Sequence, residues 1–285
     1  MTTIKSYFSL IKFSHTIFAL PFAAIGFFVA VSEPAHSYSN SLLVYVVLCM
    51  IFARSAAMAF NRYIDADIDI KNNRTATREI PSGIIRPRAA LTFTVIACIL
   101  FITTTYFINH LCFYLSPVAL FVILSYSYTK RFTALCHFIL GLGLSLAPIG
   151  AYIAVTGEFA LVPILFSCIV LTWTGGFDII YALQDEEFDS NEGLYSIPAQ
   201  IGRKKAIQLS IIVHSITALL VILTGIMGNF NYVYWIGSGL FTGLLVFQHT
   251  VVTPDDISKV NIAFGTSNGI ASVLFAISVI VGFYV

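Results

Sequence analysis

Long runs of consecutive apolar residues recur along the whole chain, and no other feature constrains its fold as strongly. A helix needs about 20 residues to cross the roughly 30 Å hydrocarbon core of a bilayer. Strands of a transmembrane barrel are about ten residues long and alternate apolar with polar side chains, so the pattern favours helices. We place nine such runs, at residues 13–32, 41–61, 89–108, 111–128, 135–155, 160–181, 206–226, 231–250 and 262–284.

The composition excludes a soluble fold. Of the 285 residues 58% are hydrophobic and only 10% are charged, against about a quarter charged in an average soluble domain. A soluble domain could not bury that much apolar surface. The first run is too long for a signal-peptide core and has no small-residue cleavage site, so we expect a retained helix. We therefore predict one all-α, polytopic membrane domain over residues 1–285, with nine transmembrane helices in one bundle.

The basic residues gather on one side of the predicted topology. Arg54 alone falls inside a predicted span, and the other 14 Lys and Arg residues lie before the first span or after the second, fourth, sixth and eighth. Cytoplasmic loops carry the excess of Lys and Arg, so we expect a cytoplasmic N-terminus. Carboxylates share the same loops, a mixture that argues against nucleic-acid binding. We place the protein in the lipid bilayer, in a bacterial inner membrane, with its active site on the cytoplasmic side.

The first acidic cluster follows the second span. Asn61, Asp65 and Asp69 are four residues apart, so they share one face if the helix continues past the membrane boundary. Arg74 and Arg78 follow in the same loop.

The second acidic cluster ends the sixth span. Asp178, Tyr181, Asp185 and Asp189 are spaced by three, four and four residues, which again lines one helix face. The orientation argument puts both clusters on the same side of the membrane.

Two facing rows of carboxylates indicate a cation between them. Like charges at this spacing repel, and Mg²⁺ binds through carboxylate oxygens together with substrate phosphate oxygens. We therefore predict Mg²⁺ at Asp65, Asp69, Asp185 and Asp189. The alternative is that these acids are solvated loop residues balanced by nearby cations.

Two ionisable groups lie deeper in the predicted spans, Arg54 and Asp178. A charge in a span is costly and should face the bundle interior with a partner. The two side chains pair with each other, or Arg54 binds an anionic group of a substrate. Lys130 lies after the fourth span, where it suits either a diphosphate or anionic lipid headgroups.

These patterns resemble the UbiA superfamily of intramembrane aromatic prenyltransferases. The resemblance covers essentially the whole chain. It is carried by the two clusters above, by the Arg74-Thr75 and Arg78 that follow the first, and by the stretch 126–133. The second cluster is most similar to the branch that acts on 4-hydroxybenzoate. The opening residues 12–16 look like relatives proposed to prenylate a dihydroxynaphthoate, so both acceptors stay open.

The resemblance implies transfer of a prenyl group from a polyprenyl diphosphate to an aromatic acid, in the biosynthesis of ubiquinone or menaquinone. Mg²⁺ on the carboxylates would neutralise the leaving diphosphate, with Asp65 and Asp185 as catalytic residues. Asp178 is our candidate for orienting the acceptor or taking its ring proton. Asn61, Arg74, Arg78 and Lys130 would complete the diphosphate site, Tyr181 would line the cavity of the allylic cation, and Arg54 would bind the acceptor carboxylate.

A cation-coupled transporter is the alternative function, because acids within membranes often mark ion pathways. Transporter sites usually lie near the bilayer midplane at broken helices, whereas these carboxylates gather at one interface. No pattern in the sequence indicates an oligomeric state.

Overall fold

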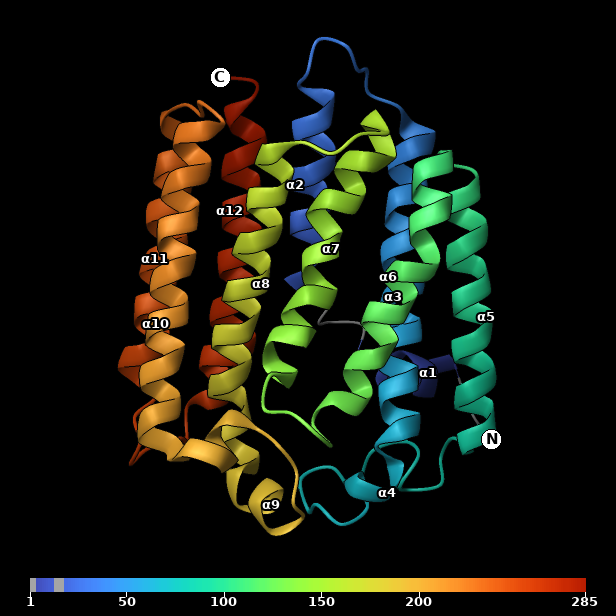
Figure 1. The fold of residues 1–285 in the computed structure, drawn as a ribbon, viewed down its shortest axis with the longest axis vertical. Coiled ribbons are helices and arrows are strands. Elements are labelled where there is room, and N and C mark those ends of the chain that lie inside the picture. Colours follow the sequence, from blue (N-terminus) through green and yellow to red (C-terminus); the bar gives the residue numbers. More distant parts are fainter. Residues whose placement is uncertain (1–3, 13–17) are drawn as a thin grey trace.

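The computed structural model describes residues 4–12 and 18–285, and these form an all-helical bundle (Figure 1). No strand occurs in the described parts of the chain, which confirms the predicted all-α class. The α-helices are α1 (Ile4–Leu10), α2 (Leu20–Val31), α3 (Asn40–Ile64), α4 (Ala66–Asp69), α5 (Pro87–Tyr106), α6 (His110–Thr129), α7 (Cys136–Thr156), α8 (Leu161–Ala182), α9 (Glu186–Asn191), α10 (Ile197–Met227), α11 (Tyr232–Val251) and α12 (Asn268–Gly282). A 3₁₀ turn η2 (Leu183–Asp185) and a π-helical turn η3 (Ile262–Ser267) complete the set.

Seven of the nine predicted spans correspond to helices that are long and apolar enough to cross a membrane. Within the described residues these are α3, α5, α6, α7, α8 with its extension to Asn191, α10, and η3 with α12. The first predicted span is represented by α2, which has 12 residues, and its opening residues 13–17 lie outside the described part of the chain. The eighth corresponds to α11, which has 20 residues, carries Gln248 and His249 near its end, and is not among these seven. The total of nine transmembrane helices therefore remains a prediction.

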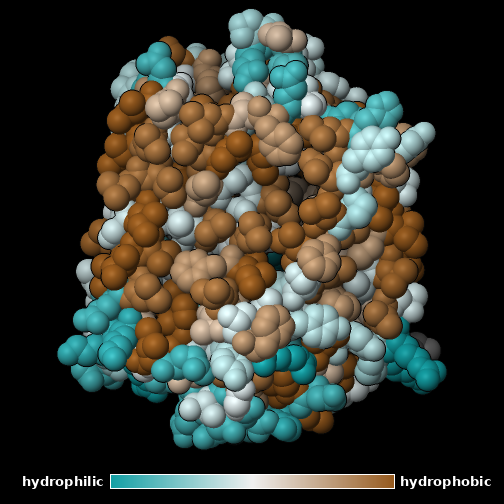
Figure 2. Space-filling view, viewed as in Figure 1, coloured by the Kyte–Doolittle hydropathy of each residue, from teal (hydrophilic) through white to brown (hydrophobic). Residues whose placement is uncertain are grey.

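The outer surface of the bundle is apolar over most of its height. Figure 2 shows a broad hydrophobic band across the face, with hydrophilic groups gathered mainly at the lower end and a smaller group at the top. Large aliphatic side chains of the long helices, such as Leu219, Ile236 and Val246, are exposed. An exposed apolar surface of this extent is expected where a protein meets lipid rather than water.

Aromatic packing fixes α8 in the centre of the bundle. Trp173 of α8 is fully buried against Phe22 of α2 and Phe241 of α11, with ring centroids 5.2 and 5.8 Å apart. Its indole Nε1 donates to Asn268 Oδ1 at 2.9 Å, and Gln248 Nε2 donates to the same oxygen at 2.8 Å. A buried polar group with its partners in place orients the helices around it.

Both acidic segments lie at the same end of the bundle. The short helices α4 and α9 stand next to the loop segments at the lower end in Figure 1, below the ends of α3 and α8. The distribution of charge along the sequence predicted that the two clusters share one side, and the fold agrees with that arrangement.

Candidate active site

The first acidic segment keeps its register although the helix breaks within it. Helix α3 ends at Ile64, Asp65 caps it, and α4 begins at Ala66. The backbone N–H of Asp65 still donates to Asn61 O at 2.9 Å, and that of Asp69 to Asp65 O at 2.7 Å. All three polar side chains are buried, and Asn61 Nδ2 donates to Asp65 Oδ2 at 3.0 Å. Asn61, Asp65 and Asp69 therefore do form one polar row.

The second acidic segment is not one continuous α-helix. Asp178 and Tyr181 belong to α8, Asp185 ends the 3₁₀ turn η2, and Asp189 lies in α9. The tighter 3₁₀ turn changes the angular spacing of the side chains, so the four residues are not carried by one unbroken α-helix. The sequence spacing alone missed this break.

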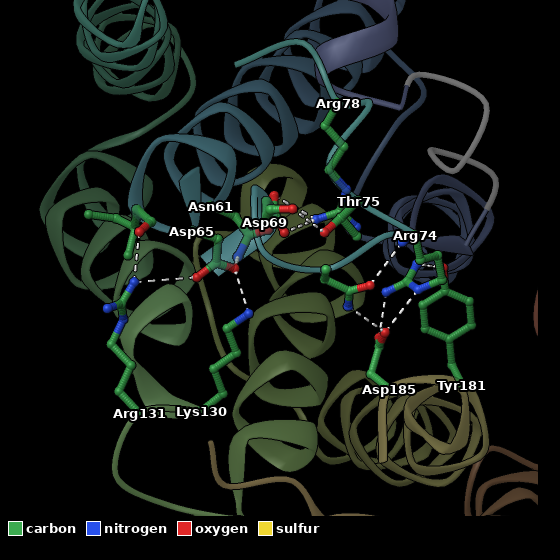
Figure 3. Close-up of polar contacts among 12 residues, drawn as sticks. Asn61, Asp65, Asp69, Arg74, Thr75, Arg78, Lys130, Arg131, Tyr181 and Asp185 are labelled. Atoms are coloured by element: carbon green, nitrogen blue, oxygen red, sulfur yellow. Dashed lines mark hydrogen bonds and ion pairs between the residues drawn. The ribbon is translucent and has the colours of Figure 1, made fainter. Parts of the chain in front are cut away.

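Cations from the first loop bind the carboxylates of the second segment (Figure 3). Arg74 makes a two-point contact with Asp185, in which Nε donates to Oδ1 at 2.9 Å and Nη2 donates to Oδ2. Asn72 Nδ2 donates to Asp185 Oδ1 at 3.0 Å, and Arg74 Nη1 donates to the Tyr181 hydroxyl at 3.2 Å. Burial disfavours the charge of Arg74, but Asp185 outweighs burial and raises the pKa of the guanidinium above its ordinary value.

The carboxylates of the first segment also have cationic partners. Arg78 Nη1 lies 2.7 and 2.8 Å from the two oxygens of Asp69. Lys130 Nζ lies 3.0 Å from Asp65 Oδ2, and Arg131 Nη2 lies 3.6 Å from Asp65 Oδ1. Figure 3 shows these side chains converging on the acidic row from two directions. The three predicted cations of the diphosphate site, Arg74, Arg78 and Lys130, are thus each in contact with an acid of the two clusters.

The donor set fits Mg²⁺ in chemistry, although the acids are not gathered into one cluster. Among the residues described, no group of three or more Asp, Glu, His or Cys is arranged to hold a metal ion. Arginine and lysine side chains lie between the carboxylates, where their charges offset the repulsion between the acids. The ligand atoms available are all oxygens, which Mg²⁺ prefers. Asp65 Oδ1 is buried without a hydrogen bond, and the Arg131 guanidinium lies 3.6 Å away, so of the two Asp65 oxygens this is the one less engaged by protein groups.

Asp178 has a partner that sequence reasoning missed. His137, at the start of α7, places Nδ1 2.7 Å from Asp178 Oδ2. A single histidine in an apolar span has no neighbouring motif, so the sequence held no signal that would have found it. The pairing of Asp178 with Arg54, one of the two alternatives from the sequence, is not formed.

Arg54 lies in an apolar cavity. An open cavity of about 360 Å³ lies between α2, α3, α5, α6 and α7, and Arg54 is the one charged residue among its described lining. Its Nη2 donates to the carbonyl of Lys12 at 3.2 Å, while its Nε is buried without a hydrogen bond. Tyr126 lines the same cavity and lies one helical turn before Lys130, the partner of Asp65. The cavity therefore adjoins the acidic site.

A comparison with protein families decides between the functional alternatives. Residues 19–283 match the model of the UbiA prenyltransferase family. The chain belongs to the UbiA prenyltransferase family. The resemblance seen in the sequence is thereby confirmed, and so is the prediction of an enzyme, a prenyltransferase. The seven apolar helices and the family together identify an integral membrane protein. The transporter alternative has no support left.

Individual UbiA relatives agree with this assignment. A 4-hydroxybenzoate octaprenyltransferase of Aliivibrio fischeri (strain MJ11) is 30% identical over 234 residues, which is 82% of this chain and 81% of the relative. A protein of the same name from Francisella tularensis subsp. mediasiatica is 28% identical, with 84% of each chain covered. The apo structure of a UbiA homolog from Aeropyrum pernix K1 superposes with a TM-score of 0.85 at 26% identity, over 94% of this chain and 97% of that one.

Proposed function

We propose that this UbiA-family enzyme transfers a polyprenyl group from its diphosphate to an aromatic acid, in a magnesium-dependent step of respiratory quinone biosynthesis. The acceptor is 4-hydroxybenzoate or a dihydroxynaphthoate. The observation that carries the proposal is the meeting of two acidic segments with Arg74, Arg78 and Lys130 at one end of the bundle, beside an apolar cavity. The names of the relatives, 4-hydroxybenzoate octaprenyltransferases, support the acceptor class.

Magnesium is supported by the oxygen ligands and by a more distant structure. A UbiA homolog from Archaeoglobus fulgidus, 21% identical and with a TM-score of 0.77, is bound to DMAPP and Mg²⁺. In this chain Asp65, Asp69, Asp185 and Asp189 would hold the ion. When bound, it would neutralise the negative charge that grows on the departing diphosphate.

The basic residues have two sets of partners in this proposal. In the structure, Lys130, Arg78 and Arg74 bind Asp65, Asp69 and Asp185. With substrate they turn their charge-assisted hydrogen bonds to phosphate oxygens, and Asn61 assists from the first row. The bond between the allylic carbon and the diphosphate oxygen then breaks, and the electron pair leaves with the diphosphate.

The acceptor completes the reaction from the cavity side. Arg54 binds its carboxylate, and Tyr181 provides an aromatic wall for the allylic cation. A ring carbon of the acceptor forms the new bond to the allylic carbon. Asp178 takes the proton from that ring carbon, and the C–H electrons restore aromaticity.

The membrane topology belongs to the same proposal. Nine spans, with α2 and α11 included, put the N-terminus and both acidic segments in the cytoplasm of a bacterium whose inner membrane holds the enzyme. The gathering of Lys and Arg in the loops at that end supports this orientation.

Product analysis tests the proposed function. Purified protein in lipid nanodiscs is incubated with a labelled prenyl diphosphate, Mg²⁺ and, in parallel, 4-hydroxybenzoate or a dihydroxynaphthoate. We expect a prenylated aromatic acid with at least one acceptor, and no product when EDTA replaces Mg²⁺. Absence of product with both acceptor classes, or undiminished product in EDTA, would contradict the proposal.

A further inference from the structure

The hydrogen bonds of His137 assign its protonation. The imidazole is buried, with Nδ1 2.7 Å from Asp178 Oδ2 and Nε2 3.2 Å from the backbone nitrogen of Ile197. A backbone N–H can only donate, so Nε2 accepts and carries no hydrogen. The neutral ring therefore has its hydrogen on Nδ1 and donates it to Asp178.

This arrangement excludes a proton relay. Both ring nitrogens are occupied, and the partner of Nε2 is an amide that cannot accept a proton. His137 therefore influences the reaction through Asp178 alone. Donation to Oδ2 fixes the carboxylate in one orientation, and no second partner for Asp178 is found in the described parts of the chain. The other carboxylate oxygen is left for the substrate.

His137 also ties Asp178 to the rest of the site. Ile197 is the first residue of α10, and the segment before it is bound to the end of α6 and the start of α7. Tyr195 N–H donates to the carbonyl of Lys130 at 2.7 Å, and Cys136 Sγ lies 3.4 Å from Tyr195 O. Because Lys130 binds Asp65, one chain of contacts connects Asp178 with the first acidic segment.

We propose that His137 is a positioning residue that aims Asp178 at the acceptor ring. The proposal rests on the proposed function, in which Asp178 takes the ring proton as the new carbon–carbon bond forms. The imidazole holds Oδ2, and the free oxygen receives the proton. A base held in place by a second, buried side chain keeps the alignment that proton transfer requires, and a misplacement of about 1 Å can cost on the order of a hundredfold in rate.

Two substitutions separate the two hydrogen bonds of the ring. In His137→Asn the amide nitrogen takes the place of Nδ1, so donation to Asp178 is kept and the contact with Ile197 is lost. In His137→Gln the amide oxygen reaches the place of Nε2, so the contact with the Ile197 N–H is kept and donation to Asp178 is lost. We expect His137→Gln to lower kcat by about tenfold to a hundredfold with an unchanged KM for the prenyl diphosphate. We expect His137→Asn to keep most of the kcat.

A double-mutant cycle with Asp178→Asn completes the test. If His137 acts through Asp178, His137→Gln lowers kcat no further once Asp178 is replaced. Additive losses, equal losses in His137→Gln and His137→Asn, or a parallel fall in thermal unfolding temperature of both variants would assign a structural role and overturn the proposal. A wild-type enzyme without turnover on either acceptor would instead overturn the proposed function itself, so the two failures are distinguishable.

Discussion

Three of the four carboxylates proposed to hold the metal are paired with cations. Asp65, Asp69 and Asp185 are bound by Lys130, Arg78 and Arg74 respectively. Removing one partner of a buried pair leaves an uncompensated charge, which is strongly destabilising. Asp→Asn also removes the negative charge, but it keeps the size of the side chain and its ability to hydrogen-bond, so it disturbs the packing of the site less than truncation to alanine does.

Arg54 provides a residue-scale prediction about the acceptor. Arg54→Leu removes the one charge in the described lining of the cavity and leaves an aliphatic side chain in its place. We expect the KM for the aromatic acid to rise by about tenfold or more, since a charge-assisted hydrogen bond contributes roughly 1.5–3 kcal/mol. The KM for the prenyl diphosphate should not change. Steady-state kinetics with each substrate varied in turn make the measurement, and Arg88→Leu, at an exposed site, is the control. Equal increases in both KM values would assign Arg54 to the diphosphate or to folding.

At the scale of elements, glycines set the spacing of α7 against its neighbours. A Cβ on Gly141 would lie 2.4 Å from the carbonyl oxygen of Leu171 in α8, and one on Gly26 of α2 would lie 2.0 Å from that of Pro148 in α7. These are backbone atoms that cannot move aside without separating the helices. Close helix approach at small residues is the usual way in which membrane helices associate.

Two alanine substitutions in α7 test this packing. Gly141→Ala should lower the unfolding temperature in detergent, because forcing atoms into a packed core costs about 1–3 kcal/mol. Gly150→Ala lies in the same helix with nothing within 4 Å of the new Cβ. It should be neutral or stabilising by up to about 1 kcal/mol, the intrinsic preference of a helix for alanine over glycine. Equal unfolding temperatures for the two variants would show that α7 and α8 are not held together at Gly141.

The sequence predicted the positions of the long helices better than the breaks within the two acidic segments. Runs such as 41–61 and 160–181 correspond to α3 and α8 within a few residues, because apolar length reports directly on membrane crossing. The break at Asp65 and the 3₁₀ turn ending at Asp185 were missed, because carboxylates at four-residue spacing continue across both. The acid–base pair of His137 and Asp178 was missed for another reason. It joins residues 41 positions apart, and no local pattern encodes such a contact.

For the molecule as a whole, the distribution of charge predicts its orientation. We expect Ser82→Cys, in the loop between α4 and α5, to react with a membrane-impermeant maleimide only after the cells are lysed. Ser37→Cys, in the loop between α2 and α3, should react in intact cells, if the outer membrane is first permeabilised. Both positions are exposed, and the five native cysteines are buried or half-buried, so the wild type serves as the background control. The opposite labelling pattern would invert the proposed topology.

The proposed reaction depends on carboxylates from two distant segments acting together on a metal-bound diphosphate. Isothermal titration of a prenyl diphosphate, with and without Mg²⁺, measures this without relying on turnover. Asp65→Asn and Asp185→Asn each neutralise one segment, and Asp67→Asn is the matched control, because Asp67 is exposed beside the buried row. We predict Mg²⁺-dependent binding by the wild type and Asp67→Asn, and affinity about a hundredfold lower or more, roughly 2.8 kcal/mol, in the other two variants. Wild-type affinity for the prenyl diphosphate in Asp65→Asn or Asp185→Asn would contradict the joint action of the two segments. An affinity that is the same with and without Mg²⁺ would contradict the metal site.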